Sequence, residues 1–315
     1  MVATLLRLYA LLLAVSLCGA IAQRLMSSKM SRYIGPEPLG RFMFWVGVPV
    51  SLIGFMRQTD IPPIDLTLPL VVGTTLVVGW GSACLLLAIN GDRSWTQERL
   101  GSFKLAAMMG NTGYLGYPVC LAVVGNSMFG WALLYDLTGT ILGTYGLGVW
   151  LASRHGRSRH LSWQRLSLRL LQTPALWGFA FGAALKLVSF PLWLDRSLGG
   201  FAWAVVGLSL IIIGMRLAQL RRWNNLPDVA PAIAIKLLAL PVAVGLLVQT
   251  MPLSPAVRLV LILQAGMPCA FSTLILAEEY RLDRDTSVTA IATSSIAFLL
   301  TLPIWLAIWG QEVIG

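Results

Sequence analysis

A polar, glycine-rich segment interrupts an apolar run near residue 110. It reads Gly110-Asn111-Thr112-Gly113-Tyr114-Leu115-Gly116-Tyr117-Pro118, within an apolar run from about residue 105 to residue 124. A run of roughly 20 residues is long enough to cross a bilayer. Proline removes a backbone donor and glycine adds no packing side chain, so a helix is expected to break here. Lipid cannot satisfy the freed backbone groups, which predicts a protein-enclosed cavity and a binding site.

A second break is predicted in Gln264-Ala265-Gly266-Met267-Pro268. Proline is best tolerated at the first helical position, so Pro118 and Pro268 are each expected to begin a second half-helix. The N-terminus of such a half-helix presents about half a positive charge and free backbone N–H groups. Two of these ends, with no carboxylate of their own, predict an anion site.

The side chains around the two breaks complete this predicted site. Asn111, Thr112 and Ser272 can add neutral hydrogen bonds. Tyr114 and Tyr117 either flank an aromatic or apolar part of the substrate or act as packing residues. The predicted substrate-binding residues are Asn111, Thr112, Gly113, Tyr114, Gly116, Tyr117, Pro118, Gln264, Gly266, Pro268 and Ser272.

Two charged residues lie inside apolar runs, where a charge costs roughly 2.5–3.5 kcal/mol on insertion scales. Asp136 is predicted to couple a proton or cation, to support the broken helices, or to pair with a nearby donor as a structural contact. Lys236 is expected to extend its amine to the cytoplasmic interface, and a position facing the substrate is the alternative.

Composition identifies the class of protein. The chain is 57% hydrophobic and 11% charged, whereas soluble domains carry about 25% charged residues. This predicts a multi-pass protein of the cell (inner) membrane, with the lipid bilayer as its surroundings. The net charge of +10 is attributed to cytoplasmic loops, so nucleic acid is not an expected partner. The four cysteines all lie in apolar runs without metal-type spacing, and neither a metal nor a cofactor is expected.

Apolar windows between loop signals predict an all-α membrane protein with ten spans. The second span is expected to be interrupted by Pro49 and the eighth by Pro241. The predicted spans are 4–22, 38–57, 67–90, 104–124, 128–152, 173–190, 197–217, 229–250, 256–278 and 286–309.

The basic residues predict the orientation. Of the 23 lysines and arginines, 17 lie in the loops after spans 1, 3, 5, 7 and 9, and only four in the opposite loops. Cytoplasmic loops carry the excess of basic residues, so both termini are expected outside the cytoplasm. Residues 8–22 also resemble a cleavable signal peptide, but cleavage would place the first basic loop outside.

The two halves resemble each other in their breaks. Residues 1–152 form a first five-span repeat, 153–172 a short basic cytoplasmic loop and 173–315 a second repeat. An odd number of spans forces opposite orientations. Paired broken helices in inverted repeats are typical of secondary transporters.

The string Asn111-x-Gly113-x-x-Gly116-x-Pro118 resembles the hallmark of the auxin efflux carrier family, which includes plant PIN-type transporters and bacterial members. The stretches 174–182, 207–217 (GLSLIIIGMRL) and 267–303 (MPCAFSTLILAEEY to LP) resemble its second half. Ser272 departs from the pattern, because family members often have asparagine after the second proline, and this leaves the substrate class open.

This resemblance implies spans 4 and 9 crossing at the substrate site. It also implies a transport domain (spans 3–5 and 8–10) that moves against a scaffold (spans 1, 2, 6 and 7) by an elevator mechanism in a homodimer. The predicted function is a secondary active or potential-driven efflux carrier of a small organic anion, such as an auxin-like or other carboxylate. A sodium-coupled organic anion symporter of the bile-acid carrier type is the alternative.

An intramembrane enzyme would need paired acids, a histidine cluster or a nucleophile–base pair within the spans. The sequence has none, so no catalytic residue is predicted.

Overall fold

The computed structural model describes residues 2–63, 65–89, 95–125, 127–157, 172–218 and 226–314. Within these ranges the chain forms helices and no strand, which confirms the predicted all-helical class. Most of the predicted basic loop (158–171), together with Arg93, Arg221 and Arg222, lies outside the described residues.

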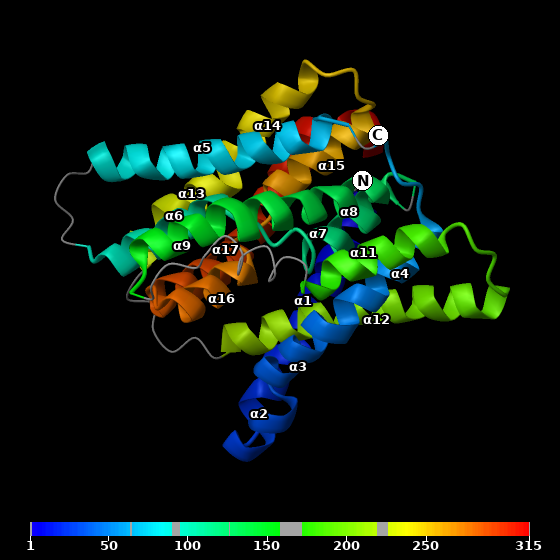
Figure 1. The fold of residues 1–315 in the computed structure, drawn as a ribbon, viewed down its shortest axis with the longest axis horizontal. Helices are drawn as coiled ribbons and strands as arrows, with labels where there is room; N and C mark the ends of the chain where they lie inside the picture. The colour runs from blue at the N-terminus through cyan, green and yellow to red at the C-terminus, as the bar shows by residue number, and fades with distance from the viewer. Residues whose placement is uncertain are drawn as a thin grey trace.

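The helices follow the predicted apolar runs closely (Figure 1). The first half contains α1 (Val2–Leu25), α2 (Ser28–Ile34), α3 (Pro36–Phe42), η1 (Met43–Gly47), α4 (Val48–Gln58), α5 (Thr67–Ile89), α6 (Gln97–Met108), α7 (Gly116–Val124), α8 (Phe129–Gly139), η2 (Thr140–Gly148) and α9 (Val149–His155). The second half contains α11 (Pro174–Leu185), α12 (Leu192–Ala218), α13 (Leu226–Ala234), η3 (Ile235–Ala239), α14 (Leu240–Gln249), α15 (Pro255–Ala265), α16 (Phe271–Tyr280), α17 (Arg284–Trp309) and α18 (Gln311–Ile314).

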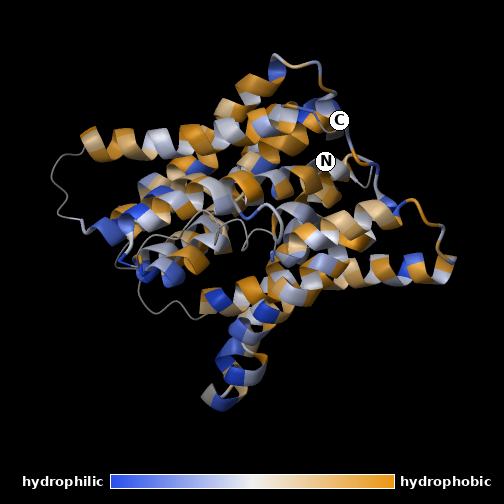
Figure 2. Cartoon of the chain, in the orientation of Figure 1, coloured by the Kyte–Doolittle hydropathy of each residue, from blue (hydrophilic) through white to orange (hydrophobic). Residues whose placement is uncertain are grey.

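Five helical stretches of the described chain are long and apolar enough to cross a membrane. They are Lys29–Gln58, Thr67–Ile89, Leu192–Ala218, Leu226–Gln249 and Arg284–Trp309. Hydrophobic residues run along the helices, and hydrophilic ones concentrate on α2 and at helix ends (Figure 2). A multi-pass membrane protein is therefore confirmed, while the count of ten spans stays a prediction.

The helices pack as two groups. In the first, the four-helix group, α4 and α12 pack together, with α1 against α12 and α11 against α4. The second, the crossing group, consists of α5 to α9 and α13 to α17 with their π-helical segments. Figure 1 shows α4, α11 and α12 beside one another on one side, and α5, α6, α9 and α13 on the other. The two groups are the elements between which a site can form.

Helices α1 and α12 approach to backbone contact at two glycines. A Cβ on Gly19 would lie 2.9 Å from the Ile211 Cα, and a Cβ on Gly214 would overlap the Ser16 carbonyl oxygen. Lipid tails are as apolar as the side chains, so helices in a membrane associate largely through close packing at small residues. The two glycines therefore let α1 pack closely against α12.

Gly214→Ala is expected to destabilise the protein, because the added methyl group clashes with the Ser16 backbone, which cannot move without shifting α1. Overpacking of this kind costs about 1–3 kcal/mol. Gly207→Ala, on the same helix, is the matched control, since nothing lies within 4 Å of its added Cβ. Thermal unfolding of the two variants in detergent checks this. Equal melting temperatures would mean that α1 and α12 are held by other contacts.

The predicted interruptions at Pro49 and Pro241 are wrong, because the chain stays helical through both. A π-helical segment, η1 or η3, comes just before each proline. A proline ring clashes with the carbonyl four residues earlier, and a widened turn moves that carbonyl away. For Pro241 this is the carbonyl of Leu237, which accepts a hydrogen bond from the Trp305 indole N–H at 3.0 Å.

Candidate functional site

The chain leaves the helix at both predicted breaks, and the two irregular segments pair with each other. Helix α6 ends at Met108 and α7 begins at Gly116, while α15 ends at Ala265 and α16 begins at Phe271. Gly110 and Cys269 form an antiparallel bridge. The Asn111 N–H donates to the Pro268 carbonyl at 2.7 Å and the Ala270 N–H to the Met109 carbonyl at 3.0 Å. Each segment thus satisfies backbone groups that the other leaves free.

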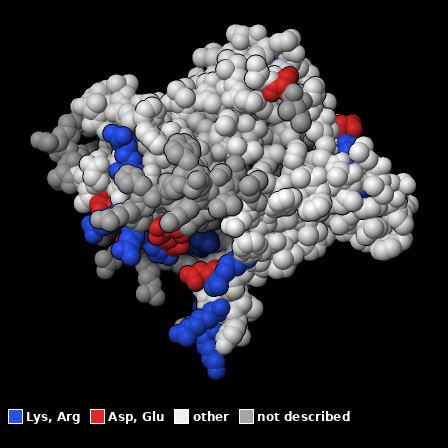
Figure 3. Space-filling view, viewed as in Figure 1, with Lys and Arg blue, Asp and Glu red and all other residues white. Residues whose placement is uncertain are grey.

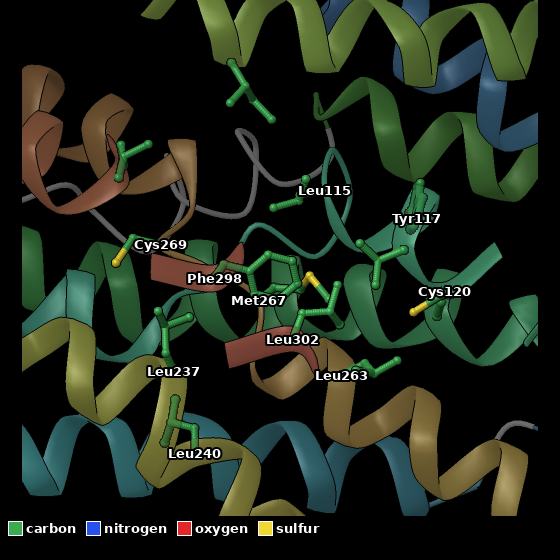
Figure 4. Close-up of a cluster of buried hydrophobic side chains, with 14 of the residues drawn as sticks. Leu115, Tyr117, Cys120, Leu237, Leu240, Leu263, Met267, Cys269, Phe298 and Leu302 are labelled. Carbon is green, nitrogen blue, oxygen red and sulfur yellow. The ribbon is translucent and has the colours of Figure 1, made fainter. Parts of the chain in front are cut away.

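Neighbouring helices support this pairing. The Cys269 N–H donates to Ser294 Oγ of α17 at 2.9 Å, and the Cys269 thiol contacts the Ala106 carbonyl at 3.2 Å. Met267, Cys269 and Leu115 belong to a buried apolar cluster with Phe298 and other side chains (Figure 4). The crossing is therefore part of the packed interior.

The two prolines occupy different places relative to their helices. Pro118 is the third residue of α7, within its first turn. Pro268 lies before α16, in the extended segment that pairs with Asn111. The expectation that Pro268 begins a half-helix is therefore wrong, because its carbonyl is engaged across the crossing and the helix starts only at Phe271.

Three glycines of the first break each make room for one polar side chain. A Cβ on Gly110 would lie 2.9 Å from Lys236 Nζ, and one on Gly113 would lie 3.2 Å from Asp136 Oδ2. A Cβ on Gly116 would overlap the side-chain oxygen of Gln264. The three side chains come from η3, α8 and α15, so three separate elements place a polar group against this segment.

Asp136 supports the first break directly. Its carboxylate accepts hydrogen bonds from the Thr112 hydroxyl and, at 2.8 Å, from the Tyr117 hydroxyl. Both donors belong to the break or to the first turn of α7. Of the interpretations left open for Asp136, this bonding favours support of the crossing, and the coupling interpretation stays a prediction.

Lys236 does not reach the interface. Its side chain is 1% exposed, and its amine donates to the Ala265 carbonyl at 2.5 Å. That carbonyl belongs to the last residue of α15, where the helix dipole favours a cation. The expectation of an extended lysine is wrong, because the crossing offers its amine a buried acceptor within reach.

Two buried amide side chains keep unused hydrogen-bonding groups. Gln264 Nε2 donates to the Ala132 carbonyl at 3.3 Å, while its Oε1 has no partner among the described residues. Asn111 is 4% exposed, and its Nδ2 has no partner in the same part of the chain. A buried unpaired polar group is costly. The unpaired Asn111 donor and the unpaired Gln264 acceptor therefore indicate a site where a ligand can form hydrogen bonds.

The two half-helix N-termini differ in what they offer an anion. In α7, the N–H groups of Gly116 and Tyr117 donate to the Asn111 and Gly113 carbonyls at 3.1 and 3.2 Å. In α16, no hydrogen bond to another described residue engages the N–H groups of Phe271 and Ser272. Free donors at both ends were expected from the sequence, and this is wrong for α7. The N-terminus of α16 is the one with free donors.

A cavity of about 750 Å³ lies where the two helix groups meet. Both groups line it, with Ser51 and Ser209 contributed by α4 and α12. The sequence-predicted residues that line it are Asn111, Thr112, Gly113, Tyr114, Tyr117, Asp136, Lys236, Gln264 and Ser272. The predicted residues outside its lining are Gly116, Pro118, Gly266 and Pro268. Most predicted residues thus meet at one cavity, and the other four shape the backbone beside it.

Tyr114 and Tyr117, for which the sequence left open a packing role or a place beside the substrate, differ in their surroundings. Tyr117 is buried, with its ring centroid 5.3 Å from that of Phe129 and 6.2 Å from that of Phe55. Tyr114 is partly exposed in the cavity, with its ring centroid 6.1 Å from that of Phe271. Tyr117 therefore packs against other rings as well as lining the cavity, and the role of Tyr114 beside a substrate stays a prediction.

Arg216 and Phe271 also line the cavity, and neither was predicted as a site residue. The Arg216 guanidinium carbon lies 4.8 Å from the centroid of the Phe271 ring. The sequence predicts for Arg216 only a basic residue at the cytoplasmic end of the seventh span. Its place four residues after Ile212, near the end of an apolar run, gave no sign that it faces a second helix group.

The chain matches a family profile described as membrane transport protein over residues 25–306. It is similar to uncharacterized transporters from two archaea. It is 27% identical to that of Methanothermobacter thermautotrophicus over 268 residues, or 85% of this chain and 87% of the relative. It is 28% identical to that of Methanocaldococcus jannaschii over 211 residues, or 66% and 68%.

An uncharacterized transporter of Escherichia coli K12 is 24% identical over 200 residues, which cover 62% of this chain and 63% of the relative. The profile match covers nearly all of the described helices, including both breaks. The chain therefore belongs to the membrane transport protein family, of the auxin efflux carrier type that its sequence resembles.

Proposed function

We propose that the protein is a carrier of a small organic anion, such as an auxin-like or other carboxylate, and that it works by alternating access at the crossing. The observation that carries this proposal is that Asn111 Nδ2 and the first N–H groups of α16 have no partner among the described residues, in the one cavity that both line. A carboxylate accepts such donors, and the positive end of the helix dipole favours its charge. Membership of a transporter family agrees with the prediction that the chain is not an enzyme.

Two inverted five-helix repeats are part of the proposal. Each break is supported from the helix that follows it, by Asp136 of α8 at the first and by Ser294 of α17 at the second. This correspondence favours ten spans, with α6 and α7 as the broken fourth and α15 and α16 as the broken ninth. The crossing group is then the transport domain and the four-helix group the scaffold. The elevator motion and the homodimer follow from the family resemblance.

The cavity is proposed to face the cytoplasm. Its lining includes Arg41, Arg216 and Glu278. Charged side chains gather over α2 and α16 and over the ends of α6 and α9 (Figure 3). The ends of the chain lie away from this region (Figure 1). Because basic residues mark the cytoplasmic side, we infer an inner-membrane protein with both termini outside and an inward-facing cavity.

The sodium-coupled alternative is not favoured by the bonding at the crossing. Sodium would need oxygen ligands that converge near the breaks. The Ala265 carbonyl already accepts from the Lys236 amine, and the Asp136 carboxylate already accepts from two hydroxyls. The Ala265 carbonyl and the Asp136 carboxylate are therefore engaged by the protein's own donors.

Carboxylate binding is expected to raise the thermal stability of the purified protein. A ligand that binds the folded state stabilises it by RT ln(1 + [L]/Kd), or about 2.7 kcal/mol at 100 times Kd. The measurement compares melting temperatures in a panel of aromatic and aliphatic carboxylates with those in the corresponding neutral amides. A panel without any carboxylate-specific shift would contradict the proposed substrate class.

A further inference from the structure

Arg216 connects the two helix groups at the cavity. It belongs to α12 of the four-helix group, while Phe271, over whose ring its guanidinium lies, is the first residue of α16 in the crossing group. Both residues line the cavity. An arginine stacked on an aromatic face is held in a defined plane. The guanidinium is therefore positioned by the Phe271 ring.

No described residue accepts a hydrogen bond from the Arg216 side chain. Its Nε is buried and has no partner among the described residues, and no ion pair in that part of the chain includes it. Four other arginines there are paired with carboxylates, namely Arg57 with Asp195, Arg99 with Asp228, Arg157 with Glu98 and Arg284 with Glu278. Arg216 differs from these in that its fork of donors faces a cavity.

Among the described residues, no acidic side chain that lines the cavity forms an ion pair with this fork. Glu278 also lines the cavity, but its carboxylate accepts from Arg284 Nε at 3.0 Å. Glu37 lines the cavity and is exposed to solvent. A guanidinium donates two parallel hydrogen bonds to one carboxylate, a geometry that a ligand carboxylate can match.

We propose that Arg216 is a carboxylate-binding residue at the mouth of the cavity. It binds an aromatic carboxylate before that ligand reaches Asn111. This inference rests on the proposed function and names the substrate class more narrowly. Phe271 lies beneath the guanidinium, and the Tyr114 ring lies 6.1 Å from the Phe271 ring. The two rings offer an apolar wall to the body of a ligand whose carboxylate is held by Arg216.

The test measures binding of phenylacetate to the full-length purified protein. Arg216→Gln is expected to weaken binding by about ten-fold or more, as loss of a charge-assisted pair implies. Arg258→Gln is the matched control, because the side chain of Arg258 donates to the Met251 carbonyl and lies outside the cavity lining. It is expected to bind as the unchanged protein does. Arg216→Gln binding phenylacetate as tightly as the unchanged protein would overturn the proposal.

A second variant keeps the test open if Arg216→Gln does not fold. Arg216→Lys keeps the charge and loses the planar fork, so weaker binding at an unchanged melting temperature is expected. Binding by Arg216→Lys at full strength would contradict a bidentate site. Failure of the proposed function looks different, since the unchanged protein would then bind no carboxylate. A third outcome is possible, in which the unchanged protein and both Arg216 variants bind phenylacetate but Asn111→Ala does not. In that case only the role of Arg216 is wrong.

Discussion

Replacing Asn111 with alanine is expected to reduce saturable carboxylate transport strongly and to leave the fold intact. The change removes a buried donor, Nδ2, that has no partner among the described residues. The backbone N–H of Asn111, which bonds to Pro268, is unaffected. A hydrogen bond to a charged group contributes about 1.5–3 kcal/mol, so transport efficiency should fall about ten- to a hundred-fold. Uptake into proteoliposomes over a range of substrate concentrations measures this.

Asn111→Asp tests the same donor with the side-chain size retained. It replaces the donor with a charge of the same sign as the proposed ligand, so carboxylate uptake should fall at least as far as in Asn111→Ala. Melting temperatures of both variants report on the fold. If Asn111→Ala unfolds at a much lower temperature than the unchanged protein, the side chain stabilises the crossing and the assigned role is wrong.

An imposed membrane potential is expected to drive net movement of the anion without any sodium gradient. A potential of 100 mV contributes about 2.3 kcal/mol per elementary charge. For a monoanion this supports an accumulation of nearly 50-fold on the positive side, since each 1.4 kcal/mol is a factor of ten. Proteoliposomes that contain potassium and valinomycin, with no sodium on either side, provide the measurement.

The same vesicles distinguish the carrier from the sodium-coupled alternative. The proposed carrier reverses its net flux when the potential is reversed. A flux that does not change with the potential and that requires sodium would show that the protein is a sodium-coupled symporter. Asp136→Asn adds a control for proton coupling, because a pH profile that the substitution leaves unchanged removes Asp136 from any such role.

The breaks were predictable because their cause is local. Glycine and proline weaken a helix wherever they occur, so the sequence around Gly113 and Pro118 was enough to place the first interruption. The same local argument failed at Pro49 and Pro241, where a π-helical turn absorbs the proline without a break. Whether a proline breaks a helix or only widens it depends on which neighbours donate a hydrogen bond to the freed carbonyl, as the Trp305 indole N–H does for Leu237.

Several features of the site depend on tertiary contacts and could not be predicted from the sequence. The start of α16 after Pro268 depends on pairing with the Asn111 segment. Lys236 is buried because the Ala265 carbonyl lies within reach of its amine. Arg216 and Phe271 are far apart in sequence and on separate helix groups, so no spacing rule joins them. Side-chain chemistry near the breaks was predictable, whereas partners across the cavity were not.

The three glycines of the first break also constrain how the chain can change over evolution. Gly110 leaves space for Lys236, and Gly113 leaves space for Asp136. Gly116 does the same for Gln264. A larger residue at any of these glycines fits only if the facing side chain becomes shorter. The positions should therefore covary as three pairs across related sequences, even though each pair joins elements that are distant along the chain.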